Sequence, residues 1–341
     1  MKKVKTEDAV GLTLCHDVTE MRDGFKGAAF KRGHVIRQED VEKLLDIGKK
    51  HIFIWEENAD EIHEEECAIM LSEMLATEGV HYTPVSEGKV VMIADTKGQF
   101  RIDTDSLYKL NSIEDITVTT IPDHYPVNPG DKLASMRIVP LVTKKSNMEL
   151  AKRLCSEHSI IELKPFNKLN VGVIITGSEV YSGRIIDKFE PVVRNKMDKY
   201  PSEIIGVKIC DDDLDMITGA AKELIDKGAD LLIFTGGMSV DPDDLTPTAI
   251  RRLGAHIVSH GVPAQPGNMT LVAYSEGDRE IAMLGVPGAA IKMPATVFDV
   301  LLPQIFTGVR ITEADLIRLG DGGLCHNCES CHFPNCTFGR Y

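Results

Sequence analysis

The sequence contains no apolar run of the roughly 18 to 20 residues that a membrane span needs, and no low-complexity tract. Its first residues are MKKVKTEDAVG. The lysines are not followed by an apolar segment, so this stretch does not resemble a secretory signal. Basic residues are in the minority, with 38 Lys and Arg against 52 Asp and Glu and a formal net charge of -14. Phosphate backbones are bound by clustered Lys and Arg. We therefore expect a soluble, cytoplasmic protein with neither a membrane nor a nucleic acid as partner.

Two common nucleotide-binding patterns are also missing. Neither GxxxxGK[ST] nor GxGxxG occurs in the sequence, which removes the main support for a P-loop nucleotidase and for a Rossmann dehydrogenase. Any phosphate site in this chain must use another arrangement of donors.

The length of 341 residues is too great for one ordinary domain and suggests two or three. Helical and strand-like patterns alternate with turn sequences along the chain. They predict an α+β module (1–57), an acidic helix (58–84), a β-rich, barrel-like module (85–147), a helix and linker (148–169), an α/β domain (170–310) and a Cys-rich tail (311–341).

The region after residue 170 has a different sequence pattern, in which apolar runs alternate with helical segments. The apolar runs VGVII, EIIGVKI, DLLIF and EIAML have strand length and are apolar throughout, as is typical of strands buried on both faces. Helical patterns lie between them, for example DLDMITGAAKELIDKG and LTPTAIRRLG, each ending at a glycine. This alternation predicts an α/β fold with three layers and a mostly parallel sheet. Ligands of such sheets bind at the carboxyl ends of the strands.

Glycine-bearing turns follow three of these strands, in ITGSEV, FTGGMSV and GVPG. Glycine lets backbone N–H groups approach an anion closely, so the turns could hold a phosphate or another oxyanion. Lys196 and Lys292 are cations that could reach an anion there. The candidate binding residues are Thr176, Gly177, Thr235, Gly236, Gly237, Ser239, Pro287 and Gly288.

Carboxylates gather at the same predicted edge. They are Glu179, Asp211, Asp212, Asp213, Asp241, Asp243 and Asp244. Carboxylates around an anion repel it unless a hard divalent cation such as Mg²⁺ lies between them. Acidic residues can instead cap the next helix, which we expect for Asp211 and Asp241. For Glu179, Asp212 and Asp244 we predict a role in the site.

The stretches VGVIITGSEV, DDLDMI, ADLLIFTGGMSVDPDD, PAQPGN and AMLGVPG occur in this order. Together they resemble the molybdenum-cofactor biosynthesis domain, the molybdopterin-binding fold, and the chain is most similar to molybdopterin molybdenumtransferases. The resemblance implies binding of adenylylated molybdopterin, use of Mg²⁺, hydrolysis of the adenylate, insertion of molybdate and a homodimer. By resemblance, Glu179, Asp212 and Asp244 are catalytic residues that bind the metal and the adenylate phosphate. The implied cradle and wall of the pocket are Gly236, Gly237, Ser239, Pro287 and Gly288.

The chain also departs from that family. Asn268 occupies a turn position that commonly carries a lysine, Asp241 replaces a usual glycine, and Ala289-Ala290 replaces a common Asn-Pro. The part before residue 170 is only partly similar to the family. A second hypothesis is therefore a non-catalytic molybdopterin carrier or maturation chaperone that serves a molybdoenzyme client. A third is a nucleotide pyrophosphohydrolase built on the same fold.

Four cysteines crowd into the C-terminal tail. Cys325, Cys328, Cys331 and Cys336 form the pattern CxxCxxCxxxxC, which supplies enough thiolates for zinc or for an iron–sulfur cluster. His326 and His332 could replace one of the thiolates. The alternatives are a disordered thiol-rich tail and thiolates that handle metal or sulfur transiently.

Overall fold

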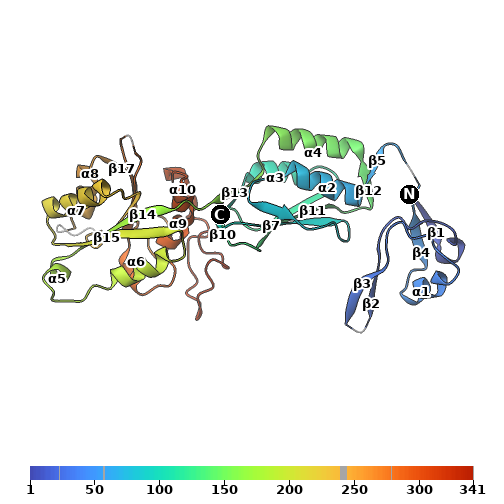
Figure 1. Ribbon diagram of the computed structural model, residues 1–341, viewed down its shortest axis with the longest axis horizontal. Helices are drawn as coiled ribbons and strands as arrows, with labels where there is room; N and C mark the ends of the chain where they lie inside the picture. Colours follow the sequence, from blue (N-terminus) through green and yellow to red (C-terminus); the bar gives the residue numbers. More distant parts are fainter. Residues whose placement is uncertain (23, 57, 239–243, 278, 341) are drawn as a thin grey trace. The chain divides into compact units, whose positions relative to one another are not determined.

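The computed structural model describes residues 1–22, 24–56, 58–238, 244–277 and 279–340 (Figure 1). The chain divides into two compact units. Unit 1 contains Met1–Ile93, Asp103–Ile121 and Lys132–Ile161. Unit 2 contains Ala94–Ile102, Pro122–Asp131 and Glu162–Tyr341. The segment 85–147, predicted as one module, thus contributes to both units, and the predicted domain boundaries stay a prediction.

The start of unit 1 is a small α+β arrangement. Its elements are β1 (Lys2–Lys5), η1 (Thr6–Asp8), β2 (Val18–Arg22), β3 (Phe25–Phe30), α1 (Asp40–Asp46) and β4 (His51–Ile54). Strand β1 pairs with β4, and β2 pairs with β3, both antiparallel. Helix α1 buries Val41 and Leu44, which lie three residues apart on one face. Leu44 joins Leu14, Ile36 and Ile52 in the core.

The rest of unit 1 is a sheet with helices. Its elements are β5 (Glu61–His63), α2 (Glu64–Met74), β6 (Val80–Tyr82), β7 (Lys89–Ala94), α3 (Thr104–Asn111), β9 (Ile116–Thr120), β11 (Lys132–Ile138), β12 (Val142–Lys144) and α4 (Lys145–Glu157). The sheet has the order β6-β7-β11-β9, and within the described residues its edge strands β6 and β9 do not pair with each other. The expected barrel-like module is therefore not confirmed. Helix α2 packs on β11 and α4 and buries Cys67, Ala68 and Leu71. The apolar face of the sheet is therefore covered by helices, whereas in a barrel it would be enclosed by the sheet itself.

Unit 2 is built on a six-stranded mixed sheet. Its strands are β14 (Leu169–Thr176), β15 (Ser202–Cys210), β16 (Leu231–Thr235), β17 (Ala255–His260), β18 (Leu271–Ser275) and β19 (Ala282–Val286). The order is β15-β14-β16-β19-β18-β17, with the first four strands parallel and β18 antiparallel to both neighbours. The four predicted strands are confirmed as β14, β15, β16 and β19. The expected burial on both faces is wrong for β15, which is an edge strand and mostly half-buried.

Helices cover both faces of this sheet (Figure 1). They are α5 (Ser178–Tyr181), α6 (Phe189–Met197), α7 (Leu214–Asp226), α8 (Thr246–Arg252), the 3-10 turn η2 (Gly288–Ile291), α9 (Val297–Thr307) and α10 (Glu313–Arg318). Successive residues of β14 point to opposite faces. Val173 and Ile175 join a core with Phe298 of α9, whereas Ile174 joins the other core with Leu224 of α7. The predicted three-layer α/β domain is confirmed.

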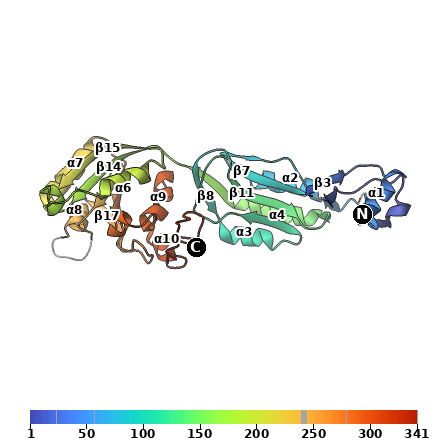
Figure 2. The same cartoon turned by 90° about the horizontal axis from the view of Figure 1, so that it is seen from below.

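A small sheet completes unit 2. It has the order β10-β8-β13 and consists of β8 (Gly98–Ile102), β10 (Tyr125–Val127) and β13 (Ile161–Pro165). Strand β8 contacts α9, and the cysteine-bearing segment after α10 runs beside β8 (Figure 2). In the described part of the chain, none of the helices has both the length and the apolar character to cross a membrane.

Candidate functional site

A cleft of about 1020 Å³ opens at the carboxyl ends of β14 and β16. Its predicted wall residues are Thr176, Gly177, Glu179, Asp212, Gly236, Gly237 and Asp244. They come together because β15, β14 and β16 are parallel neighbours, so that the turns after these strands share one edge of the sheet. The structure thus brings two of the three glycine turns together with Glu179, Asp212 and Asp244, and the roles of these residues stay a prediction.

Buried threonines join the turns after β14 and β16. The Thr176 hydroxyl donates to the Thr235 carbonyl at 3.3 Å and lies 3.3 Å from the Thr246 hydroxyl. Thr246 in turn donates to the Gly236 carbonyl at 3.0 Å. All three threonines are at most 5% exposed. These bonds fix the backbone of the glycine turn, so its N–H groups are held in place before a ligand arrives.

Only glycine suits positions 236 and 237. Gly236 has φ +84°, and a Cβ there would lie 2.2 Å from the Thr176 carbonyl oxygen. Gly237 has φ +54°, and its Cβ would lie 2.8 Å from the Thr246 hydroxyl oxygen. A side chain would therefore combine left-handed backbone strain with a clash against the neighbouring turn.

The substitution Gly236→Ala should lower the free energy of unfolding by about 1 to 3 kcal/mol and weaken binding of any ligand in the cleft. Gly254→Ala is the matched control, because Gly254 has φ +78° but no atom within 4 Å of the added Cβ. Urea unfolding followed by circular dichroism measures both variants. Equal losses in the two variants would show that the contact with Thr176 has no effect.

The three predicted carboxylates sit differently in the cleft wall. Asp212 accepts a hydrogen bond from the Ser178 backbone N–H at 2.9 Å, so it ties the turn after β15 to the turn after β14. Glu179 lies in the first turn of α5, and its Oε2 would be 3.3 Å from a Cβ on Gly177. Its carboxylate therefore folds back over the glycine turn. Asp244 lines the cleft on the β16 side.

The expected capping role of Asp211 is wrong. Asp213, two residues later, is the N-cap of α7 and accepts a hydrogen bond from the Met216 N–H at 2.7 Å. Asp211 instead accepts one from the Asp212 N–H at 2.9 Å. Asp241, the other expected cap, lies outside the described residues, as does Ser239 of the predicted cradle.

Other predicted residues lie away from the cleft wall. Thr235 is fully buried, and Pro287 and Gly288 are not among the lining residues, although Ile291 of the same segment is. The sequence analysis missed the stretch Arg184–Phe189, which forms much of the remaining wall. Its only sequence signal is a pair of cations, Arg184 and Lys188, directly after the first glycine turn.

The donor chemistry of the cleft suits a hard cation. Glu179, Asp212 and Asp244 offer carboxylate oxygens, which are the ligands of Mg²⁺ in proteins. Among the described residues, however, no three His, Cys, Asp or Glu side chains form a group that could hold a metal ion. Mg²⁺ is usually bound by one or two carboxylates together with substrate phosphates and water. The carboxylates thus fit Mg²⁺ as partial ligands.

Comparison with known families agrees with this geometry. Residues 172–307 match a family model described as "Probable molybdopterin binding domain". The match spans β14 to α9 and includes every carboxylate and glycine of the cleft wall. Over these residues the α/β domain of this chain is thus similar to molybdopterin-binding domains. Residues 3–56 match a separate model, described as a domain of unknown function (DUF8806).

Individual relatives are molybdopterin molybdenumtransferases. That of Synechococcus elongatus is 27% identical over 175 residues, which are 49% of this chain and 43% of the relative. That of Staphylococcus aureus (strain MRSA252) is 32% identical over 135 residues, which are 38% of this chain and 32% of the relative. The chain therefore spans less than half the length of these curated relatives.

Solved structures also resemble part of the chain. The tungsten cofactor synthesizing protein MoaB from Pyrococcus furiosus is 22% identical, with a TM-score of 0.35, over 41% of this chain and 94% of that chain. The molybdopterin biosynthesis enzyme MoaB from Thermus thermophilus is 21% identical, also with a TM-score of 0.35, over 41% of this chain and 97% of that chain.

Proposed function

We propose that this protein acts in molybdenum cofactor biosynthesis as a molybdopterin molybdenumtransferase. It would bind adenylylated molybdopterin in the cleft and insert molybdate with Mg²⁺-dependent release of AMP. One observation carries the proposal: a fixed glycine turn and the three predicted carboxylates, Glu179, Asp212 and Asp244, line one cleft inside the domain that matches the molybdopterin-binding model.

The chain supplies both kinds of group that an adenylate phosphate needs. The backbone N–H groups of Gly236 and Gly237 would hold phosphate oxygens, and Arg184 and Lys188 would add positive charge to the cleft wall. Glu179, Asp212 and Asp244 would supply one or two carboxylate ligands to Mg²⁺, together with phosphate oxygens and water, and the ion would neutralise the charge of the phosphoanhydride and polarise that bond. A Mg²⁺ ion between phosphate and carboxylates would explain why an anion-binding glycine turn lies beside acidic residues.

In the proposed reaction, water adds to a phosphorus atom of the adenylate and the phosphoanhydride bond breaks. If water attacks the phosphorus of the adenylyl group, AMP receives the water oxygen. If water attacks the phosphorus on the molybdopterin side, AMP leaves with the bridging oxygen. The two dithiolene sulfurs then bond to the molybdenum of molybdate, the second substrate, and their two protons leave with one oxo ligand as water. The described residues provide positioning and charge rather than a covalent nucleophile.

Turnover tests this proposal directly. Purified protein with adenylylated molybdopterin, Mg²⁺ and molybdate should release AMP and yield cofactor that activates a molybdenum-free apoenzyme. Tight binding of molybdopterin without AMP release would reject the transferase and leave the carrier. Absence of binding would reject both and leave the nucleotide pyrophosphohydrolase, which an assay with nucleotides would then test.

One observation favours the carrier as second candidate. Asn268, at the turn position where the transferases commonly carry a lysine, is exposed and is not among the cleft residues. A carrier would retain the cleft and pass molybdopterin to a molybdoenzyme client. In either case we propose a homodimer, which light scattering after size exclusion would test.

A further inference from the structure

The four clustered cysteines border one cavity. This cavity of about 450 Å³ lies in unit 2 and is separate from the cleft. Its polar lining includes Cys325, His326, Cys328, Cys331, His332 and Cys336. Met293–Ala295, which follow η2 in the body of the domain, also line it, and Phe333 and Phe338 add apolar surface. Four thiols and two imidazoles therefore face a common space with an apolar floor.

The segment that carries them, residues 322–340, is a closed loop, called here the cysteine loop. The Gly339 N–H donates to the Gly322 carbonyl at 2.9 Å, so the two ends of the loop meet. At its start, the Cys325 N–H donates to the Gln265 carbonyl at 2.8 Å. Near its end, Phe338 is only 2% exposed. The loop is thus attached to the domain at both ends and is not a loose tail.

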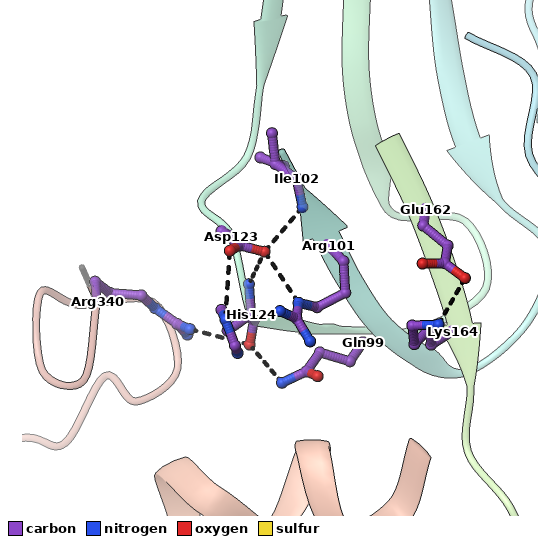
Figure 3. Close-up of polar contacts among 8 residues, drawn as sticks. All are labelled: Gln99, Arg101, Ile102, Asp123, His124, Glu162, Lys164 and Arg340. Atoms are coloured by element: carbon purple, nitrogen blue, oxygen red, sulfur yellow. Dashed lines mark hydrogen bonds and ion pairs between the residues drawn. The ribbon is translucent and has the colours of Figure 1, made fainter. Parts of the chain in front are cut away.

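Arg340 anchors the far end of the loop on the small sheet (Figure 3). Its guanidinium donates to the His124 carbonyl at 3.5 Å and to the Pro334 carbonyl at 3.0 Å, and its Cζ lies 4.4 Å from the centre of the Tyr125 ring. Arginine makes such simultaneous planar contacts better than lysine does. One side chain therefore links the cysteine loop to β10.

The backbone that receives Arg340 is itself fixed, as Figure 3 shows. Asp123 accepts hydrogen bonds from the N–H groups of His124 and Ile102 at 2.8 and 2.9 Å. Its carboxylate also pairs with Arg101 at 3.3 Å. Gln99, which is fully buried, donates to the same His124 carbonyl at 3.3 Å. The anchor point is thus held by several bonds from β8.

The thiols of the loop differ from the other cysteines of the chain. The Asn327 backbone N–H is directed at the Cys325 sulfur at 3.4 Å, a contact of the kind that stabilises the charge on a metal-bound thiolate. Cys328 and Cys331 are exposed. By contrast, burial raises the pKa of the Cys15 thiol, and that of Cys67 to about 12. Cys67 therefore remains a thiol at neutral pH, whereas the loop presents accessible sulfurs.

We propose that the cysteine loop is a metal site of its own, in which Cys325, Cys328, Cys331 and Cys336 bind a thiolate-ligated centre, either zinc or an iron–sulfur cluster. Each thiol gives up its proton to solvent as its sulfur–metal bond forms. Because no three of the described ligands yet form an ion-binding group, the loop must close on the metal. Arg340 is a positioning residue that limits how far the loop can open. None of this depends on molybdopterin binding.

Metal analysis of the full chain after anaerobic purification tests the site. We expect either one zinc per chain without visible absorbance, or iron with acid-labile sulfide and a broad visible absorption band. The double variant Cys328→Ser/Cys331→Ser should lose the metal, while Cys155→Ser, outside the loop, should keep it. A wild-type protein free of zinc, iron and sulfide, or a double variant that keeps its full metal content, would overturn the proposal.

Thiol alkylation mapped by mass spectrometry gives a second readout. In the purified protein the loop cysteines should be protected, and after treatment with a chelator Cys328 and Cys331 should react first. The buried Cys15 and Cys67 should stay unmodified in both states. Arg340→Ala should release metal to the chelator several-fold faster than wild type. Equal labelling of the loop with and without chelator contradicts the metal site, and an unchanged release rate contradicts the role of Arg340.

Discussion

Replacing Asp244 by asparagine should reduce the rate of AMP release by about 10²- to 10³-fold, the range seen when one charge-stabilising group is removed from an active site. Asp244 lines the cleft beside the glycine turn, and the change removes its charge while keeping its size. Without Mg²⁺, the affinity for adenylylated molybdopterin should not fall, since a negative charge near the phosphates has been removed. Chromatography of AMP measures the rate, and calorimetry measures the affinity.

The matched control is Asp226→Asn. Asp226 is exposed at the end of α7 in the same domain and is not among the cleft residues, so its loss should leave the rate of AMP release unchanged. If Asp244→Asn releases AMP as fast as wild type, Asp244 has no part in the reaction.

The second large effect is on stability. Lys196 of α6 and Asp299 of α9 form a buried ion pair with Nζ to Oδ distances of 2.5 and 2.7 Å, and their side chains are 5% and 7% exposed. Asp299→Asn keeps an oxygen for the capping box with Thr296 but leaves the ammonium group of Lys196 without its counter-charge. We expect the free energy of unfolding to fall by about 3 to 5 kcal/mol. Urea unfolding followed by circular dichroism measures it.

Two comparisons separate the buried charge from other effects. The double variant Lys196→Met/Asp299→Asn should regain part of the loss, because neither charge is then left alone in the interior. Glu280→Gln removes one partner of the exposed Arg310–Glu280 pair, whose side chains are both 45% exposed, and should change stability by only about 0 to 1 kcal/mol. If Asp299→Asn resembles Glu280→Gln, the buried pair does not stabilise the domain.

The α/β domain was largely predictable because its central strands are buried on both faces. Such strands must be apolar throughout, and β14 and β16 carry that pattern in VGVII and DLLIF. Parallel neighbours then place the following turns at one edge, so the meeting of Gly236 with Asp212 and Glu179 in one cleft follows from strand order alone.

Contacts between distant residues were not predictable. From the sequence, Lys196 could have reached an anion in the site. In the structure it pairs with Asp299, 103 residues away, and no local pattern encodes such a partner. The choice between Asp211 and Asp213 as cap of α7 depends on where the helix begins, and both lie within the usual uncertainty of a helix end.

The assignment of residues 94–102 and 122–131 to unit 2, between segments of unit 1, also depends on contacts between distant residues and was not predictable. Strands β8 and β10 have sequences typical of any half-buried strand, and nothing in them shows that they pack with unit 2 rather than with β7 and β9. The anchoring of the cysteine loop by Arg340 on His124 joins residues 216 apart. The spacing of the cysteines predicted a metal-binding segment, but not the cavity or its attachment.

Equilibrium binding of adenylylated molybdopterin to the purified chain tests the central claim most directly. Calorimetry should show one molybdopterin per chain, with affinity that is weakened by Gly236→Ala and left unchanged by Gly254→Ala. No measurable heat, together with no protection of the protein against thermal unfolding by the ligand, would contradict the claim that this cleft is a molybdopterin site.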